Sequence, residues 1–142
     1  MSTNAITPEQ KFERILLASL TANKEYFSKV LGILKPEFFS QERRDIFNSI
    51  KKHYKEYSLP PSLGDLEMSI KDTQNQDLRN RIFQEIQSIG DLDTSKYNTD
   101  KLCDETLSFV KDALYLKALE IGSEGLLTKN DDLKRKAEQI LD

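Results

Sequence analysis

Few residues of this chain could support catalysis or metal binding. His53 and Cys103 are the only histidine and the only cysteine, and their separation along the sequence argues against a shared zinc site. No general base is identifiable for Cys103, so we predict a helix-packing role for it. The pair Asp91 and Asp93 falls in a segment where solvation or helix capping explains such carboxylates. We therefore predict no catalytic, cofactor-binding or metal-binding residue.

The segment GSEGLLTK, residues 122–129, contains the glycines and the lysine of a phosphate-binding loop, but in another arrangement. That loop requires a glycine directly before the lysine and a strand before the whole motif. Because the segment offers neither, we do not expect it to hydrolyse ATP.

Basic and aromatic residues are concentrated in residues 35–61, a composition that could bind single-stranded nucleic acid. The candidate contacts are Arg43, Arg44, Lys51, Lys52 and Lys55. With Ser40 as N-cap, however, a helix over residues 41–57 places one apolar stripe against the core: Ile46, Phe47, Ile50, Tyr54 and Tyr57. Stacking on bases would need these rings to face outward. The sequence therefore favours an ordinary solvated basic face, with weak nucleic-acid contact as a rival hypothesis.

Length and composition favour a single all-α domain. The 142 residues include only five Gly and four Pro, and apolar residues recur mainly at helical spacing. The formal net charge of -3 argues against general binding of duplex DNA through its phosphates. One cysteine excludes an intramolecular disulfide, and no signal peptide or membrane span is recognisable. We expect a cytoplasmic protein without a membrane partner.

Capping residues and apolar spacing predict the helices. Thr7, Asn23 and Ser62 are the expected caps of helices over residues 8–22, 24–31 and 63–71. A further helix is predicted over residues 76–88, and Thr99 is expected to begin a long helix that reaches Ile121 or slightly beyond. The segment GDLDTSKYN, residues 90–98, lacks apolar periodicity. It divides a predicted helical head, residues 1–90, from a predicted helical hairpin, residues 91–142, and the two together form one domain.

The long helix has two apolar stripes, which implies two partners. One stripe contains Leu107, Val110, Leu114, Ala118 and Ile121, and the other contains Leu102, Phe109, Ala113, Leu116 and Leu119. A turn at SEGLLTKN, residues 123–130, and a second arm over residues 131–142 would complete the hairpin. The predicted protein interface comprises Phe109, Ala113, Leu116, Leu119, Leu133 and Ile140. Alternatively, the head and the second arm cover both stripes within one subunit.

The order of these features resembles the N-terminal domain of DnaB-type replicative helicases. The resemblance rests on ILLASLTANKEYFSKVLGILKPEFF, on the helix with the pattern IF..I..HY..Y, on the proline turn that follows it, and on DETLSFVKDALYLKALEI. It extends from residue 12 to about residue 125. Within the family the pattern is most similar to the replicative helicases of T-even-like bacteriophages, which implies a bacteriophage protein in the cytoplasm of its bacterial host.

The resemblance implies a domain that self-associates, as a dimer or a hexameric collar, and that docks primase and in some members a helicase loader. It also implies that the chain is a fragment, with ATP and Mg²⁺ needed only by a motor domain that follows it. DNA would be bound only through the full-length helicase. The alternative is the helicase-binding domain of a primase, or a free-standing helicase loader or adaptor, which shares this shape.

Overall fold

The computed structural model describes the backbone of residues 6–128 and the side chains of residues 6–120. Every regular element in this range is a helix, which confirms the predicted all-α class. The chain forms two compact units, Met1–Cys103 and Asp104–Asp142, here called the first and second units. Within the described residues, no helix has the length and apolar character needed to cross a membrane.

Three of the predicted caps begin helices of the first unit. Thr7 starts α1 (Pro8–Ala22) with a capping box, in which its hydroxyl accepts from the backbone N–H of Gln10 at 3.1 Å and the Gln10 side chain accepts from Thr7 at 3.1 Å. Asn23 caps α2 (Lys24–Val30). Ser62 caps α4 (Leu63–Ser69), which continues into the short 3-10 helix η3 (Ile70–Asp72).

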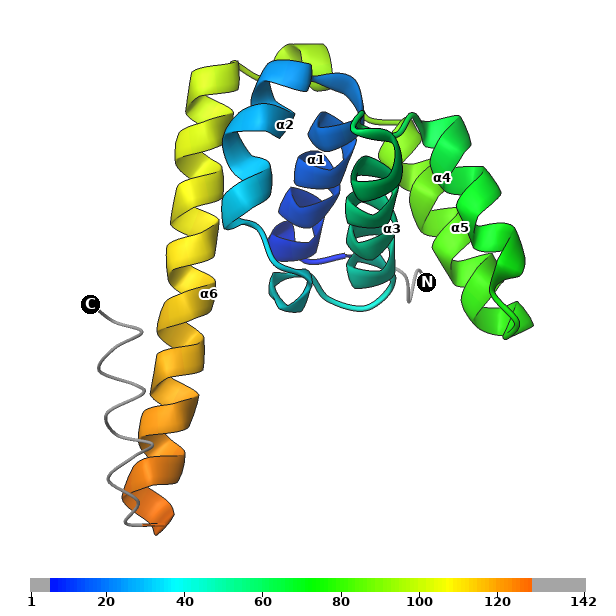
Figure 1. The fold of residues 1–142 in the computed structure, drawn as a ribbon. Helices are drawn as coiled ribbons and strands as arrows, with labels where there is room; N and C mark the ends of the chain where they lie inside the picture. The colour runs from blue at the N-terminus through cyan, green and yellow to red at the C-terminus, as the bar shows by residue number, and fades with distance from the viewer. Residues whose placement is uncertain (1–5, 129–142) are drawn as a thin grey trace. The chain divides into compact units, whose positions relative to one another are not determined.

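Helix α1 is the centre of the first unit. It packs against α2, α3 (Glu42–Tyr57) and α5 (Gln76–Gly90), while α3 also contacts α4 and α5 (Figure 1). Short 3-10 helices, η1 (Leu31–Ile33), η2 (Pro36–Phe38) and η4 (Thr94–Lys96), connect these elements. The core is apolar and includes Leu16, Leu17, Leu20, Tyr26, Phe27, Val30, Phe39, Phe47, Ile50 and Ile86. Each such side chain stabilises the fold by roughly 1.5–3 kcal/mol relative to its exposed state.

The predicted start of α3 is wrong by one residue, because Gln41 and not Ser40 is the N-cap. The hydroxyl and backbone N–H of Ser40 both contact the carboxylate of Glu13, so Ser40 does not cap the helix. The chain enters α3 through Gln41 at φ 54 and ψ -135, a conformation that non-glycine residues rarely adopt.

The predicted burial of the α3 aromatics is correct in the first turns and wrong in the last. Phe47 is buried and stacks on Phe39, with ring centroids 4.8 Å apart. Tyr54 and Tyr57 are 40% and 62% exposed. Tyr54 contacts Phe27 and Tyr57 contacts His53, and these single ring contacts leave much of each tyrosine in solvent.

Helix α6 (Thr99–Thr128) is the long helix predicted after residue 98. Its first turn is capped by Asn98, whose side chain accepts from the backbone N–H of Lys101 at 3.0 Å. The predicted N-cap, Thr99, instead accepts from the Asn23 side chain at 3.0 Å.

The turn predicted at residues 123–130 is wrong for the part that the structure describes, since residues 123–128 are helical. A glycine inside a helix costs only about 1 kcal/mol relative to alanine, and the neighbouring leucine and glutamate residues favour the helix. The second arm predicted over residues 131–142 lies outside the described residues.

Candidate protein interaction site

Helix α6 exposes four large apolar side chains among its described residues. Leu116 is 60% exposed, Tyr115 53%, Leu119 48% and Leu107 42%. The helix also buries Leu102, Val110 and Ala118. The two predicted stripes do not correspond to one buried and one exposed face, because Leu107 is exposed although Val110 and Ala118 of its stripe are buried, and Leu102 is buried although Leu116 and Leu119 of its stripe are exposed.

Of the six predicted interface residues, Leu116 and Leu119 are exposed and Phe109 and Ala113 are half-buried. Leu133 and Ile140 lie outside the described residues. The exposed pair is accessible to a partner, whereas the half-buried pair offers less surface. The interface role of all six remains a prediction.

Sequence reasoning missed Tyr115 as an interface candidate. Tyr115 precedes Leu119 by four residues and Leu116 precedes it by three, so all three side chains lie near one another on the helix. We call Tyr115, Leu116 and Leu119 the α6 patch. The i, i+4 spacing to Leu119 was a sufficient signal, but Tyr115 belongs to neither of the two predicted stripes.

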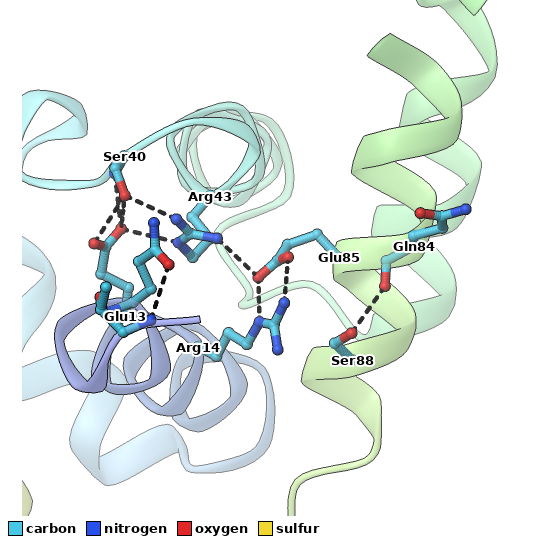
Figure 2. A network of polar contacts seen from close by, with 9 residues as sticks. Glu13, Arg14, Ser40, Arg43, Gln84, Glu85 and Ser88 are labelled. Carbon is cyan, nitrogen blue, oxygen red and sulfur yellow. Dashed lines mark hydrogen bonds and ion pairs between the residues drawn. The ribbon is translucent and has the colours of Figure 1, made fainter. Parts of the chain in front are cut away.

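The structure corrects the assignment of Arg43 to a nucleic-acid surface. Arg43 is only 2% exposed, and its guanidinium lies between two carboxylates. Nε donates to Glu13 Oε1 at 3.1 Å, Nη1 donates to Glu85 Oε2 at 3.3 Å, and Nη2 donates to the Ser40 hydroxyl at 2.8 Å (Figure 2). With all three nitrogens engaged inside the first unit, Arg43 cannot bind a phosphate.

The same cluster includes Arg14, which pairs with Glu85 through two hydrogen bonds of 2.6 and 2.9 Å (Figure 2). Burial of Glu85 opposes its ionisation, but the bonds from Arg14 and the charge of Arg43 outweigh this effect and hold the pKa of Glu85 below its ordinary value. Glu13, Arg43 and Glu85, here called the buried ion cluster, connect α1, α3 and α5. Sequence reasoning missed the two glutamates because Glu13 and Glu85 lie 30 and 42 residues from Arg43, and local spacing cannot reveal such partners.

The other four basic candidates, Arg44, Lys51, Lys52 and Lys55, are exposed on α3. Arg44 donates to the backbone carbonyl of Phe39 at 3.1 Å, and the Lys51 ammonium lies 5.8 Å from the centre of the Phe47 ring. Their side chains are accessible to a ligand, but these contacts already position two of them. Their proposed contact with nucleic acid stays a prediction.

The structure describes no group of three or more His, Cys, Asp or Glu residues arranged to hold a metal ion within its range. His53 lies 3.8 Å from Asp65, an ordinary surface pairing. Cys103 is half-buried in α6.

Comparison with known families shows the family to which the chain belongs. Residues 7–97 match the model of the DnaB-like helicase N terminal domain, which covers α1 to η4 and more than half of the sequence. The chain therefore belongs to the family of DnaB-like helicase N-terminal domains. No curated protein sequence matches it.

Proposed function

We propose that this domain associates with further copies of itself through α6 and forms the N-terminal collar of a replicative DNA helicase of the T-even-like bacteriophage type. The observation that supports this proposal is the α6 patch in a chain of this family. Tyr115, Leu116 and Leu119 are 48–60% exposed, and contiguous exposed apolar side chains are typical of protein interaction sites.

Apolar burial drives such pairing. A contact of this kind contributes about 25 cal/mol for each Å² of apolar surface removed from water, before the entropic costs of association are subtracted. Exposed Lys111 and Glu120 flank the patch and would form its polar rim. In this proposal Phe109 and Ala113 contribute their exposed edges to the same interface.

The assembled collar is also the proposed docking surface for primase and for a helicase loader in the host cytoplasm. ATP hydrolysis, Mg²⁺ binding and strand translocation belong to the motor domain of the helicase in this proposal. The described domain is thus an assembly and docking element and not the catalytic part.

Primase docking can be measured by anisotropy, with a labelled helicase-binding domain of the bacteriophage primase titrated with the chain. We expect saturable binding that weakens with the double variant Leu116→Ser/Leu119→Ser, because docking requires the assembled collar. The single variant Met68→Ser removes another exposed apolar side chain, 63% exposed on α4, and should bind like the wild type. Absence of wild-type binding would contradict the docking role, whereas self-association is tested separately by the solution mass.

A further inference from the structure

A groove in the first unit lies between α2, η1, α3 and Pro60. None of its lining residues belongs to α6. Its volume is about 400 Å³, and it is lined by Lys24, Phe27, Ser28, Leu31, Gly32, Tyr54 and Pro60. Phe27 is buried and Tyr54 is 40% exposed, with their ring centroids 5.1 Å apart. The groove therefore has an apolar lining and an accessible opening, at a size typical of ligand pockets.

Exposed apolar side chains continue from the groove along the chain. Tyr57 and Leu59, 62% and 59% exposed, stand between Tyr54 and Pro60 of the lining. Tyr57 lines a separate hollow with His53 and Met68, whereas Leu59 directly precedes Pro60 of the groove lining.

Gly32 leaves space for a side chain at the groove lining. An added Cβ at this position would meet no atom within 4 Å, and the backbone of Gly32 does not have a positive φ. Neither packing nor backbone conformation therefore requires glycine here. A glycine in a groove wall does permit close approach of a ligand to the backbone.

The described lining of the groove contains one lysine and no carboxylate, and two further lysines are neighbours of Tyr54 on α3. Lys24 lines the groove, Lys51 lies one helical turn before Tyr54, and Lys55 directly follows Tyr54. None of these three lysines has an ion-pair partner among the described residues. No carboxylate is found among the described lining residues, and the nearby Glu25 is paired with Lys29 at 3.0 Å.

We propose that this groove binds a short acidic segment of a partner protein that inserts an apolar side chain between Phe27, Leu31 and Tyr54. Carboxylates on either side of that anchor would contact Lys24 and Lys55. Charge complementarity around an apolar pocket selects such a partner and excludes basic ones. The inference concerns the first unit only and does not depend on self-association through α6.

The geometry favours a peptide over single-stranded nucleic acid. Base stacking needs an open ring face, whereas Tyr54 is packed at a tilt of 57° against Phe27 and forms one wall of the groove. A recessed apolar wall instead matches an inserted aliphatic or aromatic side chain, which is the usual anchor of a peptide.

A random peptide library displayed on phage and selected on the immobilised full chain tests the proposal. We expect enriched peptides with an excess of Asp and Glu around a Leu, Ile or Phe. A labelled peptide of the enriched sequence should bind the wild type and lose roughly tenfold or more in affinity with Gly32→Leu, which adds a bulky side chain to the groove lining. The charge reversal Lys24→Glu/Lys55→Glu should cause a similar loss and reduce the salt dependence.

Gly64→Leu is the matched control, because Gly64 is exposed on α4, is absent from the groove lining, and has space for a Cβ, whose nearest contact is at 3.7 Å. It should bind the peptide like the wild type, as should Leu116→Ser/Leu119→Ser. The proposal is wrong if no acidic peptide is enriched, or if Gly32→Leu binds the enriched peptide with unchanged affinity. It is equally wrong if labelled oligothymidylate binds the wild type at moderate salt and is lost with Gly32→Leu.

Discussion

The guanidinium of Arg43 lies 3.1 Å from the carboxylate of Glu13, and both side chains are buried where α1 meets α3. Removing one member of a buried ion pair leaves an uncompensated charge and costs about 3–5 kcal/mol. We therefore expect Arg43→Met to lower the free energy of unfolding by about this amount, as measured by urea denaturation. Met keeps most of the volume, so the loss reports chiefly on the charge.

Two further variants test whether the loss of stability in Arg43→Met comes from the buried charge and not from the removal of any arginine. Arg44→Met, on the exposed neighbour, should change stability by no more than about 0.5 kcal/mol. Glu13→Gln combined with Arg43→Met should recover part of the loss, because one buried charge is removed with its partner. Equal stability of Arg43→Met and Arg44→Met would contradict the account of the buried ion cluster.

The pKa of Glu85 predicts how stability depends on pH. Because its pKa is lowered in the folded state, the unfolded state binds the proton more tightly. The stabilisation is therefore complete above the unfolded pKa, near 4.5, and is lost as the pH falls through the lower folded pKa. Urea midpoints measured from pH 7 down to pH 3 should fall less steeply for Glu85→Gln than for the wild type. If the urea midpoints of the two proteins fell in parallel with pH, Glu85 would not contribute to the pH dependence of stability.

Gln41 is expected to be strained, since its φ of 54 and ψ of -135 suit glycine better than other residues. We predict that Gln41→Gly raises the free energy of unfolding by about 1 kcal/mol. Gln84→Gly is the control, and we expect it to lower the free energy of unfolding by about 1 kcal/mol, because Gln84 lies within α5 and glycine is unfavourable inside a helix. Destabilisation by both variants would exclude strain at Gln41.

Much of the fold follows from local signals in the sequence. Thr7, Asn23 and Ser62 each provide a side-chain acceptor just before an apolar periodic run, and such caps act over three residues. The start of α3 was mispredicted because Ser40 is engaged by Glu13, which lies 27 residues earlier and cannot be found from local spacing. The buried ion cluster was missed for the same reason.

The candidate site was predicted in part. Apolar spacing indicated that α6 has more apolar surface than one face can bury, and Leu116 and Leu119 are exposed. Periodicity could not indicate that Tyr54 and Tyr57 remain exposed, since that depends on where neighbouring helices end. It also could not reveal the groove beside Gly32, which forms only when α2, η1 and α3 come together.

The most direct test of self-association through α6 is the solution mass of the full chain, measured by sedimentation equilibrium over increasing concentration. We predict that the wild type and Met68→Ser form dimers or larger rings, and that Leu116→Ser/Leu119→Ser sediments as a monomer of 16.4 kDa with unchanged helical content. Both substitutions remove exposed side chains, so folding should be preserved. A wild type that stays monomeric throughout, or a double variant that associates equally well, would contradict the proposed role of α6.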